Sequence, residues 1–188
     1  MRRILNIILY ILLIPVFLIT FTVIHELGHT ILARLLGDPD SVFYLARIEE
    51  NSACLGCNIY DPSKLSWGAN LIVSLGGLFA SQLAALTALF LLRLNFDSRL
   101  LRGVLATIAL GFAFLDVPVQ VIQGLIYNLN QQTFATNVDL LDAMLLIQEK
   151  LGASQLLLKG LITAAAILYL FGFVLFYRLN RPPNGGNH

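Results

Sequence analysis

Charged residues are scarce in this chain. They make up 12% of its 188 residues, whereas 57% of the residues are hydrophobic and the mean hydropathy is +0.79. A soluble globular protein carries about 25% charged residues, so the composition excludes an ordinary soluble domain and indicates an integral membrane protein. The net charge of +1 also leaves no basic surface for a nucleic-acid partner.

The chain has only two cysteines and three histidines, and this limits the metal sites that it can form. A structural zinc site needs four ligands, so Cys54 and Cys57 supply half of one at most. They would form a short-loop disulfide in an oxidising compartment and remain free thiols in the cytoplasm. His188 closes a Pro/Gly/Asn tail, residues 181–188, which we expect to be disordered. Any histidine site therefore depends on His25 and His29.

Long apolar runs predict an all-α membrane protein with about four transmembrane helices and a single domain, residues 1–180. A membrane span needs about 20 apolar residues. The expected spans are residues 4–36, 67–94, 101–127 and 156–177, separated by polar connections at 37–66 and 128–154. The first run is too long for a cleaved signal peptide and has no Ala-x-Ala site before residue 25, so we expect it to be retained.

The distribution of Lys and Arg predicts the orientation. With the N-terminus inside, seven of the 12 basic residues lie on the inner side and five on the outer side. Cytoplasmic loops carry the excess of basic residues, so we expect both termini in the cytoplasm.

Within the first apolar run stands the pattern His-Glu-x-x-His, formed by His25, Glu26 and His29. Helix positions i and i+4 share a face, so the two imidazoles can bind one zinc ion beside a glutamate that acts as general base. A shuffled chain of this composition contains the pattern roughly once in a thousand cases. Ionisable residues at bilayer depth are costly and mark function. We predict one Zn²⁺ per chain, held by His25 and His29, with Glu26 as the catalytic residue.

A catalytic zinc takes three protein ligands and leaves a fourth position for water. Because His188 lies in the tail, we expect a carboxylate as the third ligand. His25 lies about 21 residues into the first span, roughly 30 Å along it, on the side where the third span ends. The segment that carries Asp139 follows on that side, so Asp139 is a candidate for this ligand. Asp116, inside the third span, and Asp142, one turn after Asp139, remain alternatives.

These motifs resemble the site-2 protease family of intramembrane zinc metalloproteases. Residues 25–37, HELGHTILARLLG, match the family's zinc motif, and residues 136–139, TNVD, resemble the segment that carries the Asp ligand in its short members. Residues 74–80 resemble the family's Gly-Pro-x-x-Asn motif, with Gly77 in place of Pro and Ala80 in place of Asn. The resemblance implies a three-helix core, an Asp ligand, and a substrate-binding role for Gly76 and Gly77, with Gln82 replacing the missing Asn.

We therefore predict a zinc metalloendopeptidase that hydrolyses peptide bonds of membrane-embedded or membrane-proximal substrates. Its partners would be a membrane protein or peptide substrate and the lipid bilayer. Ala80 and Gln123 stand where the family has Asn and Asp, and they favour the alternative of a catalytically inactive membrane scaffold or chaperone of the same fold. Glu149 would be the late ligand of a different peptidase class. Metal transport is disfavoured, because the third span alone offers a polar path.

Overall fold

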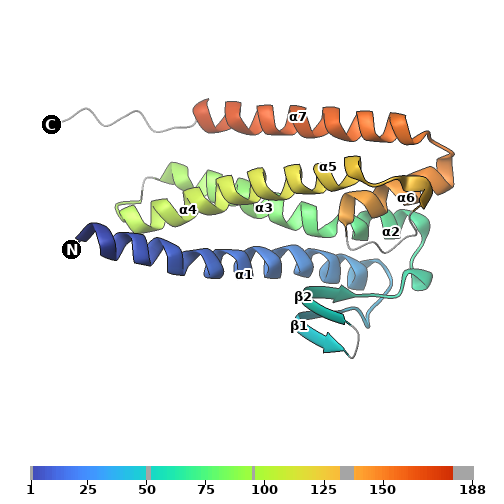
Figure 1. Ribbon diagram of the computed structural model, residues 1–188, viewed down its shortest axis with the longest axis horizontal. Helices are drawn as coiled ribbons and strands as arrows, with labels where there is room; N and C mark the ends of the chain where they lie inside the picture. Colours follow the sequence, from blue (N-terminus) through green and yellow to red (C-terminus); the bar gives the residue numbers. More distant parts are fainter. Residues whose placement is uncertain (1, 50–51, 95, 132–137, 180–188) are drawn as a thin grey trace.

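The computed structural model describes residues 2–49, 52–94, 96–131 and 138–179, most of which are helical. Within this part of the chain, four segments are long and apolar enough to cross a membrane: Leu12–Leu36, Gly76–Leu94, Arg99–Ile126 and Gln155–Arg178. Figure 1 shows them side by side along the long axis of the molecule. The fold is that of a membrane protein, as expected, and the predicted tail at 181–188, including His188, lies outside the described residues.

The first span belongs to α1 (Arg2–Leu36), which runs through Pro15 as one helix. It ends at Gly37, where φ is +138° and glycine is the favoured residue. The connection at 37–66 was expected only as a polar segment, with no strands. It contains an antiparallel hairpin of β1 (Val42–Glu49) and β2 (Ser52–Ile59), followed by a 3-10 turn, Pro62–Lys64. The chain is therefore not entirely α-helical.

The hairpin is supported by tertiary packing. An isolated two-stranded hairpin is at best marginally stable in water, but β2 lies along α1 next to the His-Glu-x-x-His turn. A Cβ on Gly56 of β2 would collide with Thr22 of α1, and φ at this glycine is +71°. Glycine is therefore required here both for its backbone conformation and for the close approach of strand to helix.

The second apolar run forms two helices where one was predicted. α2 (Trp67–Ser74) starts after Ser66, whose hydroxyl accepts a hydrogen bond from the Ala69 N–H. The helix then breaks at Leu75, and α3 (Gly76–Leu91) continues into a 3-10 turn, Leu92–Leu94. α3 packs tightly on α1: a Cβ added to Gly28 would meet the backbone carbonyl of Gly76. Small residues allow two membrane helices this close an approach.

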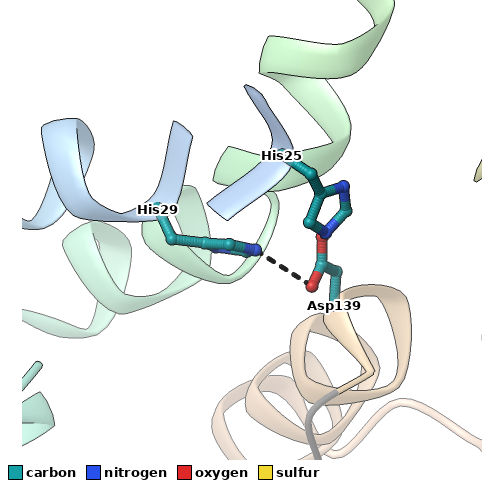
Figure 2. Close-up of side chains that lie close together, drawn as sticks. All are labelled: His25, His29 and Asp139. Carbon is teal, nitrogen blue, oxygen red and sulfur yellow. Dashed lines mark ion pairs between the residues drawn. The ribbon is translucent and has the colours of Figure 1, made fainter. Parts of the chain in front are cut away.

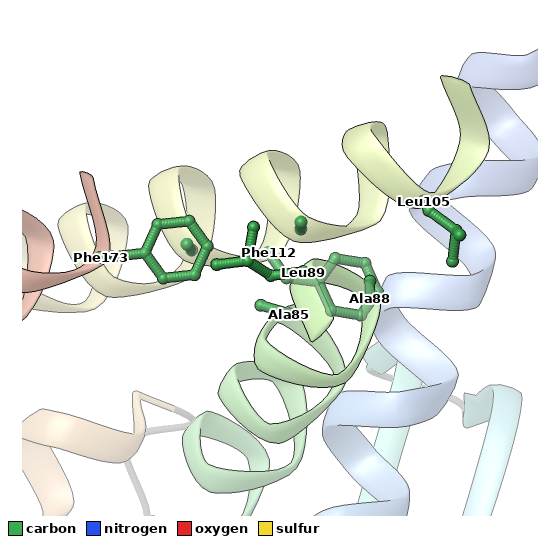
Figure 3. Packing of buried hydrophobic residues seen from close by; sticks show 8 residues of the cluster. Ala85, Ala88, Leu89, Leu105, Phe112 and Phe173 are labelled. Atoms are coloured by element: carbon green, nitrogen blue, oxygen red, sulfur yellow. The ribbon is translucent and has the colours of Figure 1, made fainter. Parts of the chain in front are cut away.

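The third span consists of α4 (Arg99–Gly111), a π-helical turn (Phe112–Asp116) and α5 (Val117–Ile126). A kink was expected at Pro118. The irregularity precedes it, because proline has no N–H and the regular bonding of the turn before it cannot continue. Figure 3 shows the buried cluster that α3 and this span form with α7 (Gln155–Leu179). Its members are Ala85, Ala88, Leu89, Leu105, Ala109, Phe112, Ala113 and Phe173.

The connection at 128–154 contains a 3-10 turn, Leu129–Gln131, and a helix, α6 (Asp139–Leu151). The helix, which was not predicted, begins at Asp139 and stops at Gly152, where φ is +63°. α6 packs against α2, and the indole N–H of Trp67 donates to the carbonyl of Leu146 at 2.9 Å. This contact holds the start of α6, and with it Asp139, against the bundle near α1 and α3.

Candidate metal centre

His25, His29 and Asp139 form one buried cluster. Their potential ligand atoms all lie within 4.8 Å of one another, and each residue is 8% exposed. Nε2 of His25 lies 3.1 Å from Oδ2 of Asp139, and Nε2 of His29 lies 3.1 Å from Oδ1. Figure 2 shows both rings directed at this carboxylate, the histidines from α1 and Asp139 from the start of α6. The arrangement could hold a metal ion.

The second nitrogen of each ring has its own partner. Nδ1 of His29 lies 2.6 Å from the carbonyl of Val73, which can only accept a hydrogen bond, so this nitrogen carries the proton. Nδ1 of His25 lies 3.3 Å from Oδ2 of Asp116. These partners assign the Nδ1–H tautomer to both rings. In this tautomer both Nε2 atoms present lone pairs to Asp139, which is the orientation that metal-binding histidines adopt.

A positive charge at the centre of the cluster would suit its ligand atoms. Two Nε2 lone pairs and a carboxylate face one another in a buried space, and Oδ2 of Asp139 has no hydrogen-bond partner. Ligand atoms that share a tetrahedral zinc at about 2.0–2.1 Å lie roughly 3.3 Å apart, close to the 3.1 Å separations found here. The residues therefore fit a divalent ion with two nitrogen ligands and one oxygen ligand.

The backbone of α3 closes the cluster on one side. A Cβ added to Gly77 would collide with Nε2 of His25 and Nε2 of His29, the two atoms that face Asp139. Glycine therefore leaves open the space that a bound ion and its fourth ligand would need. The sequence analysis assigned Gly76 and Gly77 to substrate binding; the structure places Gly77 at the metal-binding atoms and Gly76 against the backbone of His29.

A hydrogen bond to α5 holds the start of α6, where Asp139 lies. The amide oxygen of Gln120, on α5, accepts a hydrogen bond from the N–H of Leu140 at 3.3 Å. Burial alone would raise the pKa of Asp139, but the neighbouring His25 and His29, when protonated, lower it below its usual range. The carboxylate is therefore ionised, as a metal ligand must be.

Glu26 lies beneath the hairpin. Its side chain is half-buried, receives a hydrogen bond from the backbone N–H of Asn58 and lies within electrostatic range of both histidines. The Asn58 side chain donates to the hydroxyls of Thr30 and Ser41, which fixes β2 on the end of α1. β2 thus covers the helix face that carries the predicted general base.

Tyr60 follows β2 and lies at the rim of the cluster. Burial raises the pKa of its hydroxyl, a hydrogen bond with Ser74 lowers it, and the charges of Asp142 and Asp139 raise it further. The neutral phenol thus remains a hydrogen-bond donor within electrostatic range of the candidate ligand.

The other predicted site residues occupy different positions. Asp116 contacts the far nitrogen of His25 and stays outside the cluster, and Asp142 is buried one turn beyond Asp139. Gln82 donates to Ser81 and to the carbonyl of Phe112 and accepts from Tyr169. Cys57 is disulfide-bonded, and the side chain of Cys54 is not among the described side chains.

Three supporting residues were not identified as such from the sequence: Ser81, Gln120 and Asn58. Gln120 belongs to the polar path noted on the third span. An amide one turn after Asp116 within an apolar run could have indicated a supporting role at the site. The contacts of Ser81 and Asn58 depend on helix and strand packing, which the sequence pattern does not specify.

No protein-family model, curated protein or solved structure matches this chain. The geometry of the site is therefore the basis for assigning a function.

Proposed function

We propose that this protein is a zinc-dependent intramembrane metalloendopeptidase. The observation that carries the proposal is the shared orientation of His25 and His29. Each ring donates its Nδ1 proton away from the cluster and turns Nε2 towards Asp139. Two imidazoles and one carboxylate match the ligand number of a catalytic zinc site, which keeps one further position for water.

In the proposed mechanism, three residues bind the metal ion and Glu26 transfers the proton. A zinc ion held by His25, His29 and Asp139 would polarise the scissile carbonyl and make a water molecule acidic near neutral pH. Glu26 accepts a proton from that water as its oxygen bonds to the carbonyl carbon. When the C–N bond breaks, Glu26 passes the proton to the leaving amine. The Asn58 N–H and the hairpin hold the Glu26 carboxylate in position.

The location of the cluster supports a membrane substrate. Its two histidines lie within the first candidate span, and α3 packs against them. A peptide bond that reaches Glu26 must therefore enter the bundle from the bilayer or from its surface. The site-2 protease family, which the motifs resemble, also acts on such substrates.

We further propose that both termini face the cytoplasm. The start of α1 and the end of α7 lie at the same end of the bundle, and the hairpin lies towards the other end (Figure 1). The disulfide at Cys57 suits an oxidising compartment, which agrees with the positive-inside bias of the basic residues.

Metal analysis and product mapping test the peptidase proposal. The full chain, purified from membranes in detergent, should contain about one zinc per molecule, and Asp139→Ala should lose it. Peptide termini in the host's membrane proteins are then compared between cells expressing wild type and Glu26→Gln. We expect new termini within or beside membrane spans in the wild type only. Termini that persist in Glu26→Gln would contradict the mechanism.

The alternative is an inactive scaffold of the same fold, and Ala80 and Gln123 motivate it. In that case protons replace the metal, and Asp139 forms a buried ion pair with protonated histidines. A wild-type protein purified without metal, and unable to take up added Zn²⁺, would establish the scaffold. Iron in place of zinc would indicate an oxygenase-type site, because two histidines and a carboxylate also bind Fe²⁺.

A further inference from the structure

A chain of hydrogen bonds leads from the candidate metal cluster into the centre of the bundle. Nδ1 of His25 meets Oδ2 of Asp116, and the same oxygen accepts a short hydrogen bond from the hydroxyl of Ser81. The amide of Gln82 donates to the Ser81 oxygen at 3.1 Å, and the hydroxyl of Tyr169 donates to Gln82 at 2.7 Å. Four membrane-spanning segments thus contribute to one polar chain that ends at His25.

The directions of these bonds are consistent along the whole chain. Tyr169 donates to Gln82, Gln82 donates to Ser81, and Ser81 donates to Asp116. The side-chain oxygens of Gln82, Ser81 and Asp116 therefore each accept one of these hydrogen bonds. Asp116 then has only acceptor atoms to offer to His25, and the imidazole must donate through Nδ1. In the neutral ring Nε2 then carries the lone pair, and this is the nitrogen that faces Asp139.

The charge on Asp116 lacks a permanent partner of opposite sign. The carboxylate is 4% exposed, and its ion-pair partner is His25, which is charged only when protonated. A buried charge without compensation is expensive, above all in a membrane. A divalent cation at the cluster would offset the negative charges of Asp116 and Asp139.

The π-helical turn explains how a carboxylate reaches this position. Asp116 is the last residue of the turn at Phe112–Asp116, and π-helical turns are frequent at functional sites. The carbonyl of Phe112 accepts the second N–H of Gln82 at 3.1 Å. Gln82 therefore ties this turn to α3 and fixes it beside Ser81.

We propose that Asp116 is a positioning residue that fixes the metal-binding tautomer and orientation of His25, and that Ser81, held by Gln82, orients Asp116. This inference depends on the proposed metal site but not on the identity of the substrate. It assigns Asp116, an alternative metal ligand in the sequence analysis, to the far side of His25.

Zinc affinity of the purified full chain, measured by competition with a chromophoric chelator, tests the assignment. Asp116→Asn keeps the side-chain shape and removes the charge, and it should weaken zinc binding about 10- to 100-fold while stoichiometry stays at one. Asp97→Asn is the matched control, because Asp97 is exposed on the connection between α3 and α4. It should bind zinc as the wild type does.

Two further measurements separate positioning from a general loss of structure. The visible absorption of the Co²⁺-loaded protein should shift in Asp116→Asn, because cobalt reports ligand geometry. Ser81→Ala should weaken zinc binding less than Asp116→Asn, and the double variant should be no weaker than Asp116→Asn alone, because Ser81 acts through Asp116. Thr87→Ala, which removes an exposed hydroxyl from the same helix, is the control.

The outcomes distinguish the two proposals. A wild type that binds zinc, with Asp116→Asn equal to it in affinity and cobalt spectrum, would overturn the positioning role and leave the metal site intact. Additive losses in the double variant would also overturn it. A wild type that binds neither ion would overturn the proposed function itself. If Asp116→Asn does not fold, Ser81→Ala with unchanged affinity and an unchanged cobalt spectrum overturns the role of the network.

Discussion

At the residue scale, the site depends both on the side chains that supply ligand atoms and on a glycine that has no side chain. His25 and His29 supply nitrogen atoms, and Asp139 supplies oxygen atoms, but the space among them exists because Gly77 has no side chain. A methyl group there would occupy the position next to both Nε2 atoms. Gly77 stands where the resembling family has proline, so this difference from the family bears directly on the metal site.

Gly77→Ala should abolish stoichiometric zinc binding, because its Cβ would contact Nε2 of both histidines. Moving rings that are held by Val73 and Asp116 would cost those hydrogen bonds. Gly103→Ala is the matched control, since no atom lies within 4 Å of the position of its added Cβ. The measurement is zinc content after purification, and full occupancy in Gly77→Ala would contradict the described geometry.

At the element scale, the hairpin is the part of the fold that approaches the HExxH face from outside the helical bundle. It is anchored to α1 by Asn58 and, at its base, by Asp38, whose side chain is 2% exposed. The Asp38 carboxylate accepts from the backbone N–H of Asp61 at 2.7 Å and from Nζ of Lys64 at 3.0 Å. These bonds hold the chain after the hairpin against the chain before it, and so fix β2 over Glu26.

Asp38→Asn should lower the melting temperature at pH 7 by about 2–4 °C. Hydrogen bonding from the Asp61 N–H lowers the pKa of Asp38 against the opposing effect of burial, and Lys64 lowers it further. A lowered pKa stabilises the folded state above the unfolded value near 4, and this stabilisation is lost as pH falls through the folded pKa. The difference between wild type and variant should therefore shrink below about pH 4.

Asp40→Asn is the control for this experiment. Asp40 also pairs with Lys64, at 2.7 Å, but its side chain is 80% exposed. Exposed ion pairs contribute little to stability, so its melting temperature should match that of the wild type across the pH range. A pH-independent effect of Asp38→Asn would show that the carboxylate charge is not responsible.

At the scale of the whole molecule, the start of α1 and the end of α7 lie at the same end of the bundle of four candidate spans (Figure 1). A fluorescent protein fused after residue 188 and expressed in a bacterial inner membrane should fluoresce, since it folds in the cytoplasm. A membrane-impermeant maleimide added from outside should label the hairpin only after reduction, because Cys57 is disulfide-bonded. An exported C-terminus, or a hairpin that is not labelled from outside even after reduction, would reverse the proposed orientation.

Features that depend on residues close together in the chain could be predicted from the sequence, and features that depend on contacts between distant segments could not. The spans depend on composition within about 20 residues, and the pairing of His25 with His29 on the spacing within one helical turn, so both could be predicted locally. The start of α6 at Asp139 was not predicted, because the connection at 128–154 was expected only as a polar segment. The hairpin was missed because two eight-residue strands are stable only through their packing on α1. The break at Leu75 likewise reflects helix packing, whereas the π turn before Pro118 follows from the missing N–H of that proline.

The sequence by itself determined a membrane protein with two histidines and a glutamate on one helical turn, because hydrophobicity and helical periodicity are local properties. Only the tertiary structure decided which of the acidic residues faces them. Asp116, 91 positions after His25, meets its outer nitrogen, whereas Asp139 meets the inner nitrogens of both rings. Which nitrogen each carboxylate reaches depends on how α3, α5 and α6 pack around α1. A carboxylate at Nε2 can act as a metal ligand, whereas one at Nδ1 accepts a hydrogen bond and orients the ring.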